Sequence, residues 1–351
     1  MVTIDEIIDL AKERRASDVH IVPGIPIRIR VDGVLQNLDE HILTAGETEH
    51  YARELAGDGL ERITVIGELD FSRTLGDHVR CRMNVFRQQG AFSSAVRLLS
   101  DEIPEMEMLG LPSVVSDFPE YPRGIVLVTG ETGSGKSTTL ASILNRINHT
   151  RCDHIITFED PIEYIYKPDR CVINQREIGT DTESFSNGLR AALREDPDVI
   201  LVGEMRDLDT IETALTAAET GHLVFATVHT NSAPDTIDRL VDVFPEARQR
   251  QIRVQLSMTL RAVLSQQLLP RKEGIGRVAA CEVMIVNGAI RNLIREGKTP
   301  QIANSLLTSA LEGSISMDNC LIRMARERVI SPETAIAAAH DAVYLRKTIQ
   351  M

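Results

Sequence analysis

The sequence predicts an α/β protein of two domains, and three observations support this fold class. Apolar residues recur with a period of two in the first hundred residues, residues 101–123 are dense in proline, and beyond them short apolar runs alternate with helical segments. A chain of 351 residues is also longer than one hydrophobic core usually organises. We therefore expect domains at 1–100 and 124–288, a linker at 101–123 and a C-terminal helical region at 289–351.

The first domain is expected to be a small α/β unit with an antiparallel sheet. Apolar and polar residues alternate from 25 to 31, and the run ends at Asp32-Gly33, a typical hairpin turn. The same alternation predicts a second strand at 79–86. Helical periodicity at 4–15 and 47–55 adds two helices, which complete this small α/β domain.

The second domain is expected to be doubly wound, with a parallel sheet between layers of helices. Its strand candidates are apolar without alternation, which is typical of strands buried on both faces. These candidates lie at 125–129, 155–158, 199–202 and 224–228. The tail is predicted to be helical, with one helix at 303–310 and another that begins at Ser331-Pro332, an N-cap followed by proline.

The composition disfavours a nucleic-acid partner, a membrane span and a metal site built from cysteines. Acidic residues outnumber basic ones 51 to 38, and this net charge of -13 repels phosphate backbones. Apolar runs are too short for a bilayer and the first residues lack a secretory signal, so a cytoplasmic protein is expected. None of the five cysteines forms a CxxC pair, which favours cysteines that act as small buried hydrophobic residues.

Residues 130–137 form the motif with the clearest chemistry, GETGSGKS. It follows an apolar strand and precedes a helical pattern, as a phosphate-binding loop requires. Glycines let backbone N–H groups converge on phosphates, Lys136 neutralises the β and γ phosphates, and the Ser137 hydroxyl binds Mg²⁺. ATP and Mg²⁺ are the expected cofactors. The candidate binding residues are Gly130, Thr132, Gly133, Ser134, Gly135, Lys136, Ser137 and Thr138.

Polar residues follow three of the other predicted strands, at the sheet edge where ligands of parallel sheets bind. Glu204 follows 199–202 and is a candidate for Mg²⁺ and for the attacking water, with an ion pair to Arg206 as the structural alternative. Glu159, Asp160 and Glu163 follow 155–158, and each could instead cap the next element.

Two histidines are also candidate residues. His229, after 224–228, could contact the γ-phosphate or could be an ordinary hydrogen-bonded histidine. His222 follows a predicted helix end at Gly221, where it could complement the helix dipole.

Four sequence blocks in order resemble the secretion ATPase superfamily, the hexameric motors of type II secretion, type IV pili and conjugation. The blocks are GETGSGKS, ITFEDPIEY, LREDPDVILVGEMRD and TGHLVFATVHTNSA. The resemblance covers nearly the whole chain. It implies a PAS-like N-terminal α/β domain followed by a RecA-like P-loop ATPase core.

Within this superfamily the chain is most similar to the pilus retraction ATPases. Its N-terminal stretch ASDVHIVPGIPIRIRVDG is similar to theirs, the four-cysteine motif of extension and secretion motors is missing, and residues 289–294 spell AIRNLI. An ordinary amphipathic helix is the alternative interpretation of AIRNLI. The chain departs from the family pattern at Phe158, at 164–166 and at 317–319.

The resemblance implies a homo-hexamer with ATP between subunits and a basic residue of a neighbour near the phosphates. Arg82, or Arg80 on the same strand face, is the candidate for that residue, with a solvated face as the alternative. Glu163 is implied as general base. The implied partner is a platform protein in the inner membrane, reached from the cytoplasmic face. The alternatives are a pilus extension or type II secretion ATPase, and a nucleotide-gated assembly protein without turnover.

Overall fold

The computed structural model describes residues 2–31, 33–77, 79–99, 102–274 and 276–349. The chain separates into two compact units, each described by itself. The first unit comprises Met1–Ile103 with Pro161–Ile165, and the second comprises Pro104–Asp160 with Tyr166–Met351. Among the described residues, no helix combines the length and the apolar character that crossing a bilayer would need.

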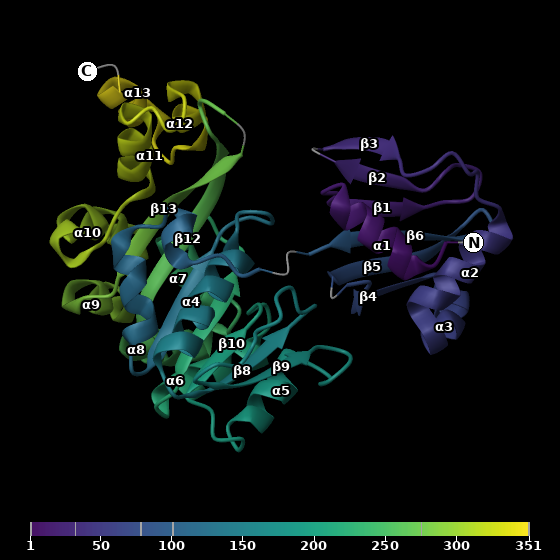
Figure 1. The fold of residues 1–351 in the computed structure, drawn as a ribbon. Coiled ribbons are helices and arrows are strands. Elements are labelled where there is room, and N and C mark those ends of the chain that lie inside the picture. Colours follow the sequence, from purple (N-terminus) through teal and green to yellow (C-terminus); the bar gives the residue numbers. More distant parts are fainter. Residues whose placement is uncertain (1, 32, 78, 100–101, 275, 350–351) are drawn as a thin grey trace. The chain divides into compact units, whose positions relative to one another are not determined.

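The first unit contains an antiparallel sheet of six strands in the order β3-β2-β1-β6-β5-β4 (Figure 1). The strands are β1 Asp18–Ile21, β2 Arg28–Val31, β3 Val34–Asn37, β4 Glu68–Leu75, β5 Val79–Gln88 and β6 Ala91–Leu98. Helices α1 (Ile4–Glu13), α2 (Ala45–Ala56) and α3 (Leu60–Ile66) accompany the sheet. Their apolar residues share one core with the inward side chains of the strands, such as Val19, Ile29 and Met83.

The alternation predicted for this sheet is present, with one correction. In β5 the buried residues are Val79, Cys81, Met83 and Val85, as expected. The strand predicted at 25–31 begins only at Arg28. Pro26 cannot donate a hydrogen bond to a ladder, and the preceding residues turn toward 38–43 instead. In the hairpin that follows, Val31 pairs with Val34 and Gly33 has φ +82°, whereas Asp32 lies outside the described residues.

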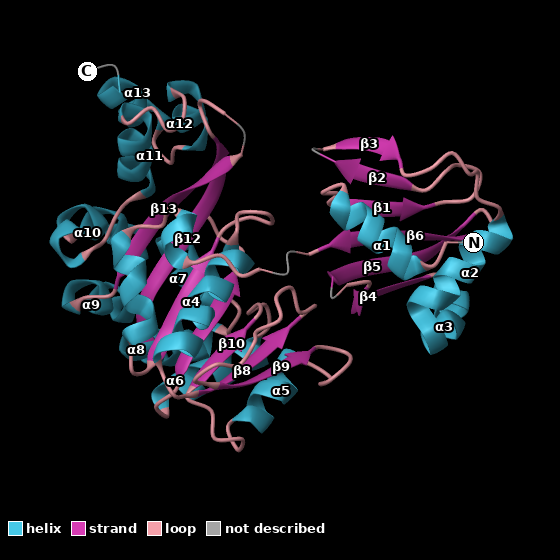
Figure 2. Cartoon of the chain, in the orientation of Figure 1, coloured by secondary structure: helices cyan, strands magenta, loops and turns pink. Residues whose placement is uncertain are grey.

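The second unit contains a seven-stranded sheet in the order β13-β12-β7-β11-β10-β8-β9 (Figure 2). Its strands are β7 Gly124–Thr129, β8 His154–Glu159, β9 Val172–Glu177, β10 Val199–Val202, β11 Leu223–Val228, β12 Leu260–Pro270 and β13 Arg277–Ile285. All neighbours are parallel except β12 and β13, which form an antiparallel hairpin. The four predicted strands are confirmed. The mixed α/β fold class is confirmed as well.

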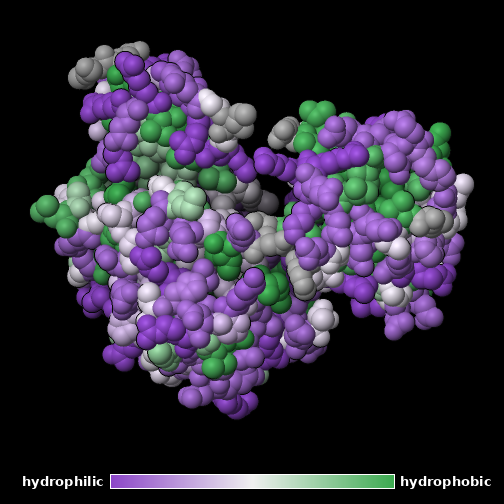
Figure 3. Space-filling view, in the orientation of Figure 1, coloured by the Kyte–Doolittle hydropathy of each residue, from purple (hydrophilic) through white to green (hydrophobic). Residues whose placement is uncertain are grey.

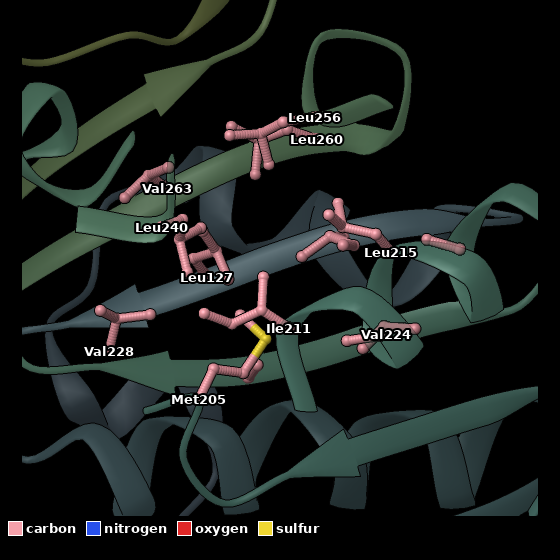
Figure 4. Close-up of a cluster of buried hydrophobic side chains, with 14 of the residues drawn as sticks. Leu127, Met205, Ile211, Leu215, Val224, Val228, Leu240, Leu256, Leu260 and Val263 are labelled. Carbon is pink, nitrogen blue, oxygen red and sulfur yellow. The ribbon is translucent and has the colours of Figure 1, made fainter. Parts of the chain in front are cut away.

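Helices cover both faces of this sheet because its crossovers run in two directions. The connection from β7 to β8 moves one way along the strand order and the connections from β10 to β11 and from β11 to β12 move the other way, so right-handed crossovers put their helices on opposite faces. The helices are α4 Lys136–Thr150, α5 Phe185–Ala192, α6 Leu208–Glu219, α7 Ala233–Asp242 and α8 Glu246–Thr259. Those from α5 to α8 bury the apolar core of Figure 4, in which Leu127 of β7 lies near Ile211 of α6.

Of the linker expected at 101–123, the residues from 104 onward belong to the second unit. They form two 3-10 helices, Met106–Leu109 and Ser113–Glu120. The Ser142 hydroxyl of α4 donates to the Pro104 carbonyl at 2.5 Å, and Arg146 of α4 pairs with Glu107 at 2.9 Å. The prolines therefore interrupt regular helix and strand without making this segment independent of the helix that follows the glycine-rich loop.

The tail forms the helical region expected from the sequence. Its helices are α9 Gly288–Glu296, α10 Ile302–Thr308, α11 Met317–Arg326, α12 Pro332–Ala338 and α13 Ala342–Ile349. Ser331 caps α12 by accepting from Thr334 N. The helix predicted at 303–310 ends at Thr308, and Leu307 is exposed together with Leu311, where hydrophobic atoms reach the surface near α10 (Figure 3). The cysteines Cys81, Cys171, Cys281 and Cys320 are buried as expected, whereas Cys152 is exposed.

Candidate functional site

The glycine-rich loop joins β7 to α4 in the way its spacing predicts. Gly130 has φ +141°, and a Cβ there would lie 2.3 Å from the Gln266 carbonyl oxygen. Gly135 has φ +92° at the N-cap of α4, and a Cβ there would meet the Gln266 amide at 2.8 Å. Both positions therefore require glycine for conformation and for space. The loop places the N-terminus of a fifteen-residue helix beside a glycine-lined backbone, which suits a phosphate.

Lys136 and Ser137 occupy the first turn of α4. The Lys136 ammonium is buried and donates to the carbonyls of Gly130 and Glu131, each at 2.8 Å. These two acceptors hold the positive charge against the loop, where a phosphate would meet it. Ser137 is exposed, so its hydroxyl is accessible to a metal ion. The loop thus fits the triphosphate and the Mg²⁺ that its sequence predicts.

Gln266 of β12 braces the loop, and the sequence alone did not single it out. Its side-chain oxygen accepts from the Thr139 hydroxyl of α4 at 2.9 Å, and its residue is buried. The preceding residue of β12, Ser265, accepts from the Thr129 hydroxyl of β7, also at 2.9 Å. The available signal was a polar pair, Gln266-Gln267, inside an otherwise apolar run followed by a glycine-containing turn.

The polar residues predicted at strand ends lie at one edge of the sheet. The strands β7, β11, β10 and β8 are consecutive neighbours in the sheet and parallel, so their carboxyl ends meet there. The loop follows β7, His229 follows β11, Glu204 follows β10 and Glu159 ends β8. Four segments separated in sequence therefore contribute polar side chains to one edge.

Glu204 contacts two of its predicted neighbours. Its Oε2 lies 2.7 Å from an Arg206 guanidinium nitrogen and 3.6 Å from His229 Nε2. The ion pair with Arg206, weighed as a structural alternative, is thus present together with the histidine contact. Met205 is buried in the core beside Ile211 (Figure 4), and its backbone N–H donates to the Thr227 carbonyl at 3.0 Å. This anchoring holds the adjacent Glu204 at the end of β10.

His229 is partly exposed at the edge, with a side-chain exposure of 40%. Partial burial lowers its pKa from the ordinary 6.5, the positive charge of Lys136 lowers it further, and Glu204 partly opposes the shift. The charges of Lys136 and Glu204 therefore both act on the imidazole of His229. Near neutral pH the ring is therefore neutral and available as a hydrogen-bond donor or acceptor.

The loop after β11 forms one wall of a cleft beside the glycine-rich loop. The cleft has a volume of about 510 Å³ and is lined by Glu131, Thr132, His229, Thr230 and Asn231. Asn231 Nδ2 donates to Glu131 Oε1 at 3.3 Å, and this contact joins the two loops. Ser232 caps α7 by accepting from Asp235 N, so the loop runs directly into a helix.

The three carboxylates after β8 have different surroundings. Glu159 Oε1 accepts from the Thr157 hydroxyl at 2.6 Å and from the Gln175 amide at 3.3 Å, and Asp160 is exposed. The alternative that they cap the next element is wrong, because the next element is the strand β9 and not a helix. Glu163 belongs to the segment Pro161–Ile165 of the first unit, and it is half-buried there.

The two candidate arginines lie on one face of β5, as predicted. Arg82 is exposed, and Arg80 is half-buried with its Nε donating to the Ile162 carbonyl at 3.4 Å within the first unit. His222 has the structural role weighed for it, since its Nδ1 lies 2.8 Å from the Ala217 carbonyl near the end of α6. AIRNLI forms most of α9, with Ile290 and Ile294 buried and Arg291 and Arg295 exposed.

Comparisons with known proteins agree with this arrangement. A family model described as "Type II/IV secretion system protein" matches residues 1–317. The chain is 45% identical to the type IV pilus retraction ATPase PilT of Pseudomonas aeruginosa, over 95% of this chain and 96% of that protein. It is 46% identical to a twitching motility protein of Neisseria gonorrhoeae, over 90% of this chain and 84% of that protein.

Solved structures give the same result for the fold. A crystal structure of the pilus retraction motor PilT with bound ADP superposes with a TM-score of 0.92 at 46% identity, covering 99% of this chain and 100% of that one. The ATPase DotB of Legionella pneumophila superposes with a TM-score of 0.83 at 28% identity, covering 95% of this chain and 93% of that one. The likeness therefore extends through both units and the helical tail.

Proposed function

The chain belongs to the type II/IV secretion system protein family, and we propose that it is an ATP-hydrolysing motor that drives the retraction of a type IV pilus. The resemblance indicated by the four sequence blocks is confirmed by the family match and by the identity to PilT. The observation that carries the proposal is the meeting of the glycine-rich loop, His229 and Glu204 at the carboxyl ends of three neighbouring parallel strands.

Nucleotide binding is assigned to the loop and the first turn of α4. Backbone N–H groups of 130–138 and the Lys136 ammonium would hold the phosphates, and a phosphate would take the place of the carbonyl contacts that Lys136 makes now. The Ser137 hydroxyl and the Glu204 carboxylate would hold Mg²⁺, which would neutralise part of the negative charge of the phosphates.

Hydrolysis requires a water molecule held in line with the γ-phosphate and a group that takes its proton. Glu204 would orient this water, and Glu163 is proposed as the general base. The neutral His229 imidazole and the Asn231 amide would contact the γ-phosphate from the cleft wall. Asn231 also donates to Glu131, so loss of the γ-phosphate would change the contacts of both loops that line the cleft.

The working assembly is proposed to be a homo-hexamer in which Arg82 of one subunit approaches the nucleotide of its neighbour. Arg82 fits because it is exposed on a strand of the first unit. The output would act on a platform protein in the inner membrane, reached from the cytoplasmic side. No nucleic-acid partner is proposed, in line with the net charge of -13.

Calorimetry tests the nucleotide site. The wild-type protein should bind Mg-ATP, and Lys136→Ala should weaken binding by at least about tenfold, because one ammonium contact to phosphate is lost. Lys272→Ala, in the turn between β12 and β13, is a matched control and should bind like the wild type. A wild-type protein without affinity for Mg-ATP would contradict the proposed function.

Gene deletion in the host tests the direction of work. Loss of a retraction motor should leave an excess of surface pili, and loss of an extension motor should leave cells without pili. Pilus number, counted by electron microscopy in the deletion strain and in a strain with the gene restored, distinguishes the two. A deletion strain without surface pili would contradict the proposed retraction and would not affect the proposal that the protein hydrolyses ATP.

A further inference from the structure

Glu282 of β13 is a buried carboxylate that the proposed chemistry does not use. Its residue is 3% exposed, and its two oxygens accept from the first residues of two different helices. Oε1 accepts from Ala233 N of α7 at 2.8 Å, and Oε2 accepts from Met317 N of α11 at 3.3 Å. Both N–H groups belong to helix first turns, where no backbone acceptor within the helix is available.

A carboxylate at this depth is costly to keep, so its contacts matter. Burial raises the pKa of Glu282, while the two backbone N–H groups and His340 favour the charged form. His340 Nδ1 lies 3.9 Å from Oε2. An apolar residue would fill this position in β13 without that cost, yet it would leave both helix N–H groups buried without an acceptor. The Glu282 side chain therefore links the N-termini of α7 and α11 by hydrogen bonds.

The two helices lead to different parts of the second unit. α7 begins directly after the 229–231 loop that lines the candidate nucleotide cleft. α11 carries Asp318, whose carboxylate accepts from His340 N at 2.8 Å and from Asp341 N at 3.0 Å. The packing of α11 against α12 and α13 then extends this connection through the C-terminal helices.

The C-terminal end of this connection returns to the glycine-rich loop. His340 and Ala337–Ala339 line a second cleft, of about 500 Å³, together with the loop residues 131–134 and Asn231. Gln267 Nε2 donates to the Ala338 carbonyl at 3.5 Å, next to the Gln266 that braces the loop. The glycine-rich loop and the C-terminal helices thus line the same cleft. Glu282 adds a second connection, because it binds both α7 and α11.

We propose that Glu282 is a positioning residue that couples the nucleotide site to the C-terminal helices. It ties the first turn of α7 to the first turn of α11, so that a nucleotide-dependent shift of the 229–231 loop moves α11 and, with it, the 340–341 turn. This inference rests on the proposed function, because it requires a nucleotide that contacts the 229–231 loop.

Hydrogen–deuterium exchange on the full-length protein tests the coupling, with and without Mg-ATPγS. In the wild type, nucleotide should slow exchange in residues 130–138 and also in residues 316–321. Glu282→Gln replaces one acceptor oxygen by an NH₂ donor, so it cannot accept from both helices through two oxygens. The variant should keep the nucleotide response at 130–138 and lose the response at 316–321.

Glu327→Gln is the matched control, because it makes the same chemical change on an exposed residue at the end of α11. It should keep both responses. A purely structural role for Glu282 predicts another result: faster exchange of α11 by the same factor with and without nucleotide, which leaves the nucleotide-induced difference unchanged. That result would overturn the coupling.

The wild-type measurement can overturn the coupling even where Glu282→Gln fails to fold. A response at 130–138 without any response at 316–321 overturns the coupling and leaves the nucleotide site standing. Absence of a response at 130–138, together with no calorimetric binding, overturns the proposed function itself. A response at both segments that survives in Glu327→Gln and disappears in Glu282→Gln establishes the coupling.

Discussion

The two sheets of this protein put their polar side chains in different places. In the seven-stranded sheet, β7, β10 and β11 are buried at every residue, and the candidate catalytic groups follow the strands at one edge. In the six-stranded sheet, charged residues form a row across the face opposite the buried one. Arg30, Asp18, Arg97 and Arg82 lie in one row across four strands, opposite the buried face.

This difference follows from how each sheet is covered. Helices on both faces leave a parallel sheet only its ends for chemistry, whereas an antiparallel sheet with helices on one face can present charge on the other. In the row across the first unit, Asp18 accepts from Arg97 at 3.0 Å and lies 3.9 Å from Arg30. The second unit is thereby suited to hold a small ligand in one place, and the first to present charge over an area.

The largest expected effect tests the strand ends. Glu204→Gln should lower ATP turnover by roughly 10²- to 10³-fold, because the variant removes the charge that orients the water. Mg-ATP binding should change little, because the glycine-rich loop, Lys136 and Ser137 still hold the nucleotide and the metal. Phosphate release under Mg-ATP saturation measures it. Glu212→Gln is the control, since Glu212 also pairs with an arginine, Arg248, but lies in α6 away from the strand ends. Equal losses in both variants would remove Glu204 from the mechanism.

The next effect tests the charged face. Arg82→Ala should lower turnover of the assembled protein by about a hundredfold, because a cationic group that stabilises the transferred phosphate is lost. Its melting temperature should change little, since the side chain is exposed. Arg97→Ala, on the neighbouring strand of the same face, should retain most of the turnover. A result in which Arg97→Ala loses activity and Arg82→Ala keeps it would reassign the role to a different arginine.

A smaller effect tests how tightly the second unit is packed on both faces. A Cβ at Gly188 of α5 would lie 2.6 Å from the Phe158 ring, so Gly188→Ala should lower the free energy of unfolding by about 1–3 kcal/mol. Adding Phe158→Leu in the same chain should recover part of this loss, because the smaller side chain leaves room. Urea unfolding, followed by circular dichroism, measures both.

Gly46 of α2 in the first unit is the matched position, because a Cβ there would meet nothing within 4 Å. Gly46→Ala should leave stability unchanged or raise it by up to about 1 kcal/mol. A loss at Gly46 as large as the loss at Gly188 would show that helix covering is equally tight in both units. That result would contradict the inference that helices pack more tightly on the sheet that is buried on both faces.

The smallest effect concerns pH. The pKa of His229 is lowered from 6.5, mainly by burial and then by Lys136, so the folded protein binds fewer protons at this site than the unfolded chain does. This site's stabilising contribution is therefore fully present above pH 6.5 and declines as the pH falls through 6.5 toward the folded pKa. Wild type should lose more stability than His229→Gln between about pH 7.5 and about pH 5.5.

An NMR titration of the His229 ring measures the cause directly. Lys136→Met should raise the imidazole pKa toward its ordinary value, because it removes the nearby positive charge. A titration midpoint that does not move in Lys136→Met would separate the histidine from the glycine-rich loop. It would also contradict the inference that the charge of Lys136 acts on this imidazole.

Local patterns account for the nucleotide loop, for β2 and β5 of the first sheet, and for β7, β8, β10 and β11 of the second. Eight consecutive residues contain the glycines, the lysine and the hydroxyl that a phosphate needs, so their spacing alone predicts the geometry of β7, loop and α4. The strand ends at Glu204 and His229 were predictable for a similar reason, since an apolar run followed by a charged or imidazole side chain marks an edge. The β12–β13 hairpin was not predicted, because the polar residues Gln266 and Glu282 interrupt the apolar pattern of its strands.

By itself, then, the amino-acid order determined the two kinds of sheet, the phosphate loop and the identity of the polar groups that end the strands. Only the tertiary structure decided which strands are neighbours, that Gln266 of β12 braces Thr139 of α4, and that Glu282 joins Ala233 to Met317. The physical reason is range: backbone periodicity and glycine conformations act within a few residues. Strand order and buried hydrogen bonds join residues that are far apart along the chain, and they are selected only when the whole core packs.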